Sequence, residues 1–313
     1  MISPKIFITV FLLIVIFYLS CSSGQSASSL PTSEYAIATF LTGQADDATY
    51  LTAARVLTYQ LIHAPDTKIN TTSISFLVLC SPTVPLSHKL QLQKDGASVV
   101  EVEDVPVNWW IRSGVTRWRE QFTKLRIFEM TEYSRVLFVD ADTMLLEPLD
   151  AIFTEPEVVD LAHPLLDRKK AIKKDEAQLP AEWLFAARSD NAFTGERAHP
   201  VPPLQTNSFS AGFWICAPDK QIFAHLRSIM GHWRRFDPHT MEQSLLNYVF
   251  RRDGAMPWRE LGWKWSATWP SERDRDMGVK SLHEKFWKTG PEELQKTWTA
   301  RKDEMEALLG TLG

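Results

Sequence analysis

Two acidic residues, Asp140 and Asp142, follow directly on an apolar run that ends at Val139. Such a run is typical of a buried parallel strand, and open α/β sheets bind ligands at the carboxyl ends of their strands. Because the aspartates are two residues apart, their carboxylates project to the same side of an extended chain and can hold one divalent cation. Without a cation the two charges would repel, and the pKa of one carboxyl would rise. An isolated D-x-D is more often a turn or a helix cap, so the flanking sequence decides.

The flanks of the aspartate pair extend the pattern. Ahead of the strand, apolar residues at positions 118, 122, 125 and 128 recur at helical spacing. The ordered run is Phe122-Thr123-Lys124-Leu125, Tyr133-Ser134-Arg135-Val136, Asp140-Ala141-Asp142 and Leu149-Asp150. It resembles the central segment of glycosyltransferase family 8, the glycogenin-like retaining enzymes. The resemblance implies metal-dependent transfer of a hexose (glucose, galactose or N-acetylglucosamine) from a UDP-sugar to a hydroxyl of a glycan, protein or small-molecule acceptor.

Strands and helices alternate in the part of the chain that would position the pair. The patterns predict strands at 35–42, 74–81 and 97–105, and helices at 46–61 and 86–96. This order predicts a doubly wound, mostly parallel α/β sheet, and the resemblance implies that it is a single GT-A domain over residues 34–313. No G-x-G-x-x-G follows the first strand, which disfavours a dinucleotide enzyme. A net charge of −4 disfavours nucleic acid as the main partner.

The resemblance also assigns the donor site. The end of the first strand and the tyrosine after it would hold the uracil, which assigns that role to Thr39, Phe40 and Tyr50. Lys124 would neutralise the nucleotide sugar or its phosphate, with a solvated surface lysine as the alternative. A lysine late in the family binds the diphosphate, and Lys285 is the candidate here, or else Lys288.

The residues around the reacting sugar depart from the family in two places. The strand at 207–218 resembles the F-N-S-G strand that passes under the donor sugar, and Gly212 allows backbone and ligand to approach closely. The family often has an aspartate where this chain has Asn207, which cannot act as a nucleophile or a base. Glu242 and Gln243 begin a segment that resembles the family's D-Q-x-x-x-N helix, with glutamate in place of aspartate. We expect a front-face transfer in which Asn207 and Gln243 position the sugar, while Glu242 is the one nearby carboxylate that could instead act as a nucleophile in a double displacement.

His283 follows a short apolar strand and resembles the histidine that completes the family's metal site. The motif is contracted, because Lys285 follows at once and no glycine intervenes. Two carboxylates with one imidazole favour Mn²⁺ over Mg²⁺ or Ca²⁺, since a nitrogen ligand prefers the softer ion. The departures leave a weak or inactive sugar-binding or scaffold protein of the same fold as an alternative. A metal-dependent phosphohydrolase is a further alternative, but it would need a water-activating base that the sequence does not identify.

Four other features of the sequence carry weaker signals. The charged segment 165–204 is expected to be a solvated excursion that could hold an acceptor loop. Tryptophans at 258, 263, 265 and 269 indicate either sugar stacking or a small core. The apolar pattern of 291–312 predicts an amphipathic helix that covers the sheet. Cys80 and Cys216 lie in apolar strands and are expected to be buried free thiols.

The N-terminus carries a targeting signal. Residues 6–19 are almost wholly apolar after Lys5, which predicts a signal-anchor or signal peptide over residues 1–21 and a flexible stem over residues 22–33. We favour a type II membrane protein of the Golgi with a luminal catalytic domain. Asn70 lies in an N-glycosylation sequon, which only the secretory pathway can use.

Overall fold

A computed structural model describes residues 33–43, 47–112, 116–192 and 197–311. The predicted anchor at 1–21 and nearly all of the predicted stem at 22–33 lie outside these residues. Within the described ranges, no helix has the length and apolar character needed to cross a membrane.

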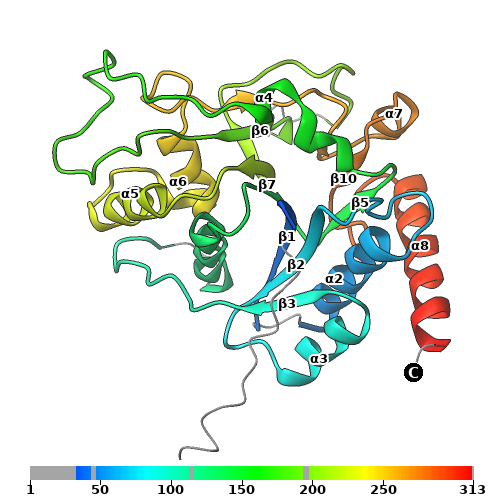
Figure 1. Ribbon diagram of the computed structural model, residues 1–313. Helices are drawn as coiled ribbons and strands as arrows, with labels where there is room; N and C mark the ends of the chain where they lie inside the picture. The colour runs from blue at the N-terminus through cyan, green and yellow to red at the C-terminus, as the bar shows by residue number, and fades with distance from the viewer. Residues whose placement is uncertain (1–32, 44–46, 113–115, 193–196, 312–313) are drawn as a thin grey trace, which may run out of the picture. The chain divides into compact units, whose positions relative to one another are not determined.

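The centre of the catalytic unit is a seven-stranded sheet with the order β3-β2-β1-β4-β7-β6-β8 (Figure 1). Its strands are β1 (Tyr35–Leu41), β2 (Ile74–Cys80), β3 (Ser98–Glu101), β4 (Arg135–Val139), β6 (Phe185–Ser189), β7 (Phe209–Cys216) and β8 (Arg259–Glu260). β1 to β4 run parallel, and β7 is antiparallel to both of its neighbours. The predicted doubly wound, mostly parallel sheet is therefore confirmed.

Two helical layers bury the faces of this sheet. On one face lie α2 (Asp47–Ile62) and α3 (Leu86–Lys94), and on the other lie η1 (Thr116–Glu129), α5 (Lys220–Gly231) and α6 (Glu242–Val249) (Figure 1). The α3 helix stops before Gly96, which has a φ of 105° that only glycine adopts without strain. Cys80 and Cys216 are buried free thiols, as predicted.

The segment before β4 is a 3-10 helix, whereas its spacing had indicated helix without specifying the type. Phe122, Leu125 and Phe128 are fully buried, and they recur every three residues, which matches a helix of three residues per turn. Phe128 stacks on Trp214 of β7 with 5.6 Å between ring centroids. This packing holds η1, and with it Lys124, against the sheet next to the aspartates.

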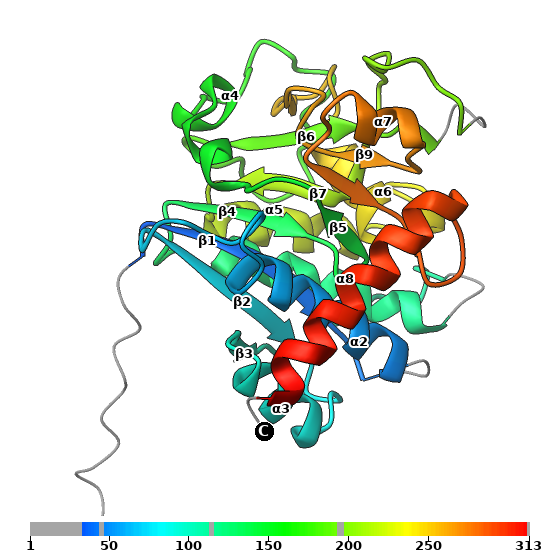
Figure 2. The same cartoon turned by 90° about the vertical axis from the view of Figure 1, so that its right-hand side faces the viewer.

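A second, three-stranded sheet has the order β5-β10-β9. It is built from β5 (Thr143–Leu145), β9 (Ala267–Thr268) and β10 (Ser281–His283). The C-terminal helix α8 (Glu292–Thr311) packs on α2 and on this small sheet, through Leu294, Trp298 and Met305 (Figure 2). The prediction that this helix covers the central sheet is wrong, because α2 already occupies that face.

The prediction of a solvated excursion at 165–204 is also wrong in part, because the segment contains β6, all of whose residues are buried. The tryptophan question is settled for two residues: Trp258 and Trp265 belong to the core. The remaining short elements are η2 (Asp150–Thr154), α4 (Pro156–Val159), η4 (Pro238–Thr240) and α7 (Glu272–Asp276).

Candidate active site

Asp140, Asp142 and His283 meet where β4 ends, and one ligand atom from each lies within 4.8 Å of the others. The aspartates form the turn between β4 and β5, and His283 ends β10, which pairs antiparallel with β5. The His283 Nε2 atom lies 3.1 Å from Asp142 Oδ1 and 3.5 Å from Asp140 Oδ2. Adjacent ligands of an octahedral ion with bonds of about 2.1 Å stand about 3 Å apart. The donor set and its spacing therefore fit a divalent cation.

Gly212 of β7 makes room for this arrangement. A Cβ atom there would lie 2.2 Å from Cε1 and 2.4 Å from Nδ1 of His283, closer than any real contact. The Gly212 carbonyl also accepts a hydrogen bond of 2.9 Å from the backbone N–H of Asp140. The glycine thus faces the imidazole directly, whereas the sequence had suggested close approach to a ligand.

Opposite charges hold the imidazole and the carboxylates together. Burial by itself would raise the pKa of Asp142, but the charge of His283 and its hydrogen bond outweigh burial, so the pKa is lowered. Burial by itself would lower the pKa of His283, and Asp142 reverses the sign, so the pKa is raised. Asp142 and a protonated His283 therefore stabilise each other's charge.

Lys124 joins the aspartate turn to helix α6. Its Nζ atom donates to Asp140 Oδ1 at 2.8 Å and to Glu242 Oε1 at 3.1 Å, and the side chain is buried. Burial opposes the charged form of Lys124, but the two carboxylates raise its pKa well above the usual value. Burial raises the pKa of Glu242, while Lys124 opposes that rise. In the structure, Lys124 is buried and neutralises two carboxylates of its own chain, the partly buried Asp140 and the buried Glu242.

Gln243 is fixed by two hydrogen bonds. Its Oε1 atom accepts from the Ala211 N–H at 2.9 Å, and its Nε2 atom donates to Asp190 Oδ2 at 3.3 Å. Asn247, one turn further along α6, bonds both the N–H and the carbonyl of Phe209. The amide of Gln243 is therefore held at the amino end of β7, beside Gly212.

The residues predicted to bind the donor lie on β1, on α2 and directly after β10. Thr39 and Phe40 are buried in β1, and the Thr39 hydroxyl has no hydrogen-bond partner among the described residues. Tyr50 of α2 packs edge-on against Trp287 at 5.6 Å. Burial would lower the pKa of Lys285, but Asp142 and a hydrogen bond to Tyr50 raise it. Tyr50 and Lys285 thus lie beside the aspartates.

No family model matches the chain. An uncharacterized protein of Schizosaccharomyces pombe is 28% identical over 87% of this chain and 74% of its own length. Galactinol synthase 1 of Solanum lycopersicum is 28% identical over 74% of this chain and 64% of its length. Glycogenin-1 of Caenorhabditis elegans is 31% identical over 64% of this chain and 36% of its length.

A solved structure of the galactosyltransferase LgtC, in complex with donor and acceptor sugar analogs, shares the fold. It superimposes with a TM-score of 0.52 at 14% identity and covers 86% of this chain and 95% of its own. The chain is a glycosyltransferase, and it is similar to members of family 8. Its fold is the GT-A fold that the family resemblance implied.

One residue predicted for the site, Asn207, lies apart from this cluster, and one that was not predicted, Asp190, belongs to it. Asn207 is exposed in the loop ahead of β7. Asp190 is buried directly after β6 and accepts a hydrogen bond from the Gln243 amide. Burial raises the pKa of Asp190. The sequence signal was an acidic residue at the end of an apolar run, as at Asp140, but the surrounding charges concealed that run.

Proposed function

We propose that this glycosyltransferase moves a hexose from a UDP-sugar to an acceptor hydroxyl, with Mn²⁺ bound by Asp140, Asp142 and His283. The observation that carries the proposal is the convergence of this triad with Lys285 and Tyr50 at the carboxyl end of β4. A divalent ion held there would supply positive charge for the diphosphate as it leaves. An ammonium group beside the carboxylates is suited to the same diphosphate.

The proposed transfer retains the anomeric configuration by a front-face route, in which the leaving diphosphate takes the acceptor's proton. Glu242 supports this choice, because its carboxylate is buried and bonded to Lys124 and so is poorly placed to attack a sugar. Gln243 has a fixed amide that can position sugar hydroxyls. Asn207 remains a candidate for the same task from the loop ahead of β7, and its amide cannot act as a nucleophile.

The test is donor hydrolysis by the purified full chain, followed by transfer with a panel of acceptors. We expect UDP-glucose, UDP-galactose or UDP-N-acetylglucosamine to be turned over with Mn²⁺, and no turnover of GDP- or CMP-sugars. A chelator should stop the reaction, and Mn²⁺ should restore it best. Full turnover in excess chelator would refute the metal site, and equal use of all nucleotides would refute a uracil pocket.

The proposed location is the Golgi membrane, with the catalytic unit in the lumen. Asn70 offers a direct test, because it is exposed and its sequon is glycosylated only in the secretory pathway. In cells the chain should lose apparent mass on treatment with an N-glycosidase, and Asn70→Gln should abolish that loss. A chain that never acquires a glycan, although it folds and is active, would contradict luminal placement.

A further inference from the structure

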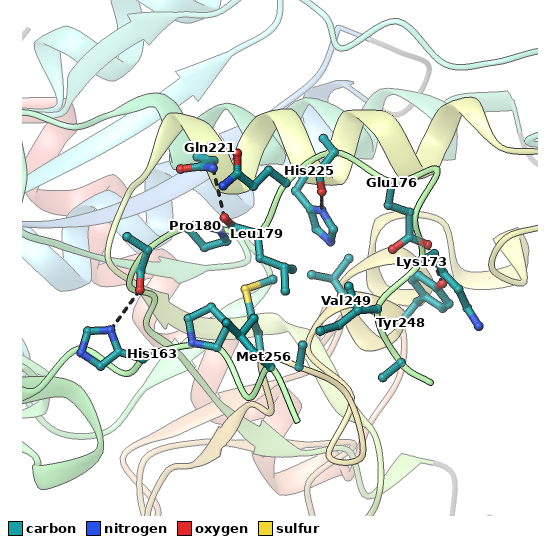
Figure 3. A pocket seen from close by; sticks show the side chains of 18 of the residues that line it. His163, Lys173, Glu176, Leu179, Pro180, Gln221, His225, Tyr248, Val249 and Met256 are labelled. Atoms are coloured by element: carbon teal, nitrogen blue, oxygen red, sulfur yellow. Dashed lines mark hydrogen bonds between the residues drawn. The ribbon is translucent and has the colours of Figure 1, made fainter. Parts of the chain in front are cut away.

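A cavity of about 600 Å³ lies between α5, α6 and the segment 163–181 (Figure 3). It lies toward the end of the β6–β7 strand pair that is opposite to the active site. The segment 177–181 leads into the amino end of β6, where Phe185 pairs with Cys216, whereas Asp190 and Gly212 lie toward the other end of the same strand pair. The cavity has the volume of a small-molecule site and is separate from the reaction centre.

The walls of the cavity are mainly apolar. Leu179, Val249 and Met256 contribute aliphatic and thioether surface, and the Tyr248 ring adds an aromatic face (Figure 3). The Arg251 guanidinium, which also lines the cavity, lies 4.7 Å from the centre of that ring and donates to the backbone carbonyls of Tyr248 and Ala171. These walls suit a flat or compact apolar body.

His225 provides one ring nitrogen, Nε2, that has no hydrogen-bond partner among the described residues. The side chain is 4% exposed, and in Figure 3 its ring projects from α5 toward the middle of the cavity. Its Nδ1 atom lies 2.7 Å from the Ala177 carbonyl, which can only accept, so Nδ1 carries the proton. The Nε2 atom of the neutral ring is therefore an acceptor, and it has no partner within the described part of the chain. Burial lowers the pKa of His225, which keeps the ring neutral near pH 7.

The charges around the cavity narrow the class of ligand. The carboxylate of Glu176 already accepts from the Tyr248 hydroxyl at 2.8 Å and from Arg235 at 2.7 Å. Lys173 and Lys174 lie on the rim and would repel a cation. A buried acceptor, an apolar wall and a basic rim together favour a neutral molecule that donates one hydrogen bond.

We propose that this cavity binds a neutral small molecule with an apolar body and one hydroxyl group, which donates to His225 Nε2. The ligand would touch Tyr248 and Val249 at one end of α6, the helix that carries Gln243 at the other end. Binding does not depend on the transferase chemistry proposed above.

The experiment uses two probes, 2-naphthol and 2-methoxynaphthalene, which share a ring system while only the first can donate. Calorimetric titration of the full chain should give 2-naphthol an affinity roughly five- to tenfold higher, as expected for one hydrogen bond to a buried acceptor. His225→Leu should remove that preference, while His225→Gln, which keeps an acceptor, should retain part of it. The matched control His88→Leu, on α3 across the sheet, should leave it unchanged.

Thermal melts establish that each variant is folded before its affinities are compared. The proposal is overturned if neither probe binds the folded wild-type chain, if both bind equally, or if folded His225→Leu still prefers 2-naphthol. Activity with a UDP-sugar serves as an independent readout, so failure of this proposal and failure of the proposed function can be told apart.

Discussion

Replacing Gly212 by alanine tests whether the glycine exists to seat the metal-ligating imidazole. The new methyl group would lie 2.2 Å from His283 Cε1, whereas ordinary contacts begin near 3.4 Å, so the ring must retreat by about 1.2 Å. A displacement of about 1 Å in a reacting group costs roughly 100-fold in rate. We therefore expect Gly212→Ala to lower turnover by about two orders of magnitude and to weaken activation by Mn²⁺.

The assay is UDP-sugar hydrolysis over a series of Mn²⁺ concentrations, together with a thermal melt to show that the variant is folded. Gly231→Ala is the matched control, because an added Cβ at the end of α5 meets nothing within 4 Å. It should leave both the rate and the Mn²⁺ dependence unchanged.

The double variant Gly212→Ala/His283→Ala tests whether the glycine acts through the imidazole. In His283→Ala the ring is gone, so adding Gly212→Ala should cost little more, and the two losses should be far from additive. Wild-type activity in Gly212→Ala, or losses that multiply in the double variant, would show that the glycine does not act through His283.

The remaining predictions concern the carboxylates, the nucleotide and acid stability. Glu242→Gln should lower turnover only about 10–100-fold, and a loss as complete as that of Asp142→Asn, or a trapped glycosyl adduct on Glu242, would restore a double-displacement mechanism. UDP with Mn²⁺ should raise the melting temperature while GDP and ADP hardly change it, and equal shifts would exclude a uracil pocket. Lys124→Met should lower the free energy of unfolding by about 3 kcal/mol in chemical denaturation, since it leaves the buried Glu242 without its cation and removes one cation from the partly buried Asp140, and an unchanged midpoint would contradict the bridge. Because the pKa of His225, which faces Glu176 and Arg251, is depressed below 6.5, the native state resists protonation and stability should fall as the pH drops through that value. Chemical denaturation at several pH values from 7.5 to 5 gives the free energy of unfolding as a function of pH. This free energy should fall less steeply with decreasing pH for His225→Gln than for the wild type, and an identical fall would show that the ring is not held neutral.

Features of the fold that depend only on local sequence periodicity could be predicted from the sequence. The alternation of apolar strands and amphipathic helices up to Val139 gave the parallel half of the sheet, because strand burial and helix spacing are local properties. The convergence of Asp140 and Asp142 with His283 was predictable although His283 is far away in the chain, since a strand that ends in a histidine is a recognisable pattern once the family resemblance is in place. Metal binding by these residues stays a prediction.

What failed depends on contacts between distant segments. The buried strand β6 lies in a stretch of charged residues, and nothing local shows that Arg188 finds Glu260 as an ion-pair partner. The tail helix has the periodicity of a sheet-covering helix, but its neighbours are decided by α2, which reaches the sheet first. The bridge from Lys124 to Glu242 joins residues 118 apart and could not be read from either segment.

The chain order of the metal triad sets a sequence of events during synthesis. Asp142 and His283 are 141 residues apart, so at about 5–20 residues per second roughly 7–28 s separate their appearance on the ribosome. A complete cation site cannot exist in that interval, and the parallel half of the sheet has to form without it. Lys124 stands 16 residues ahead of Asp140 and is therefore already made when the first aspartate emerges. Lys124, which bonds Asp140 in the folded chain, is thus available to neutralise this carboxylate before His283 is made, and all three proposed ligands could hold a cation only afterwards.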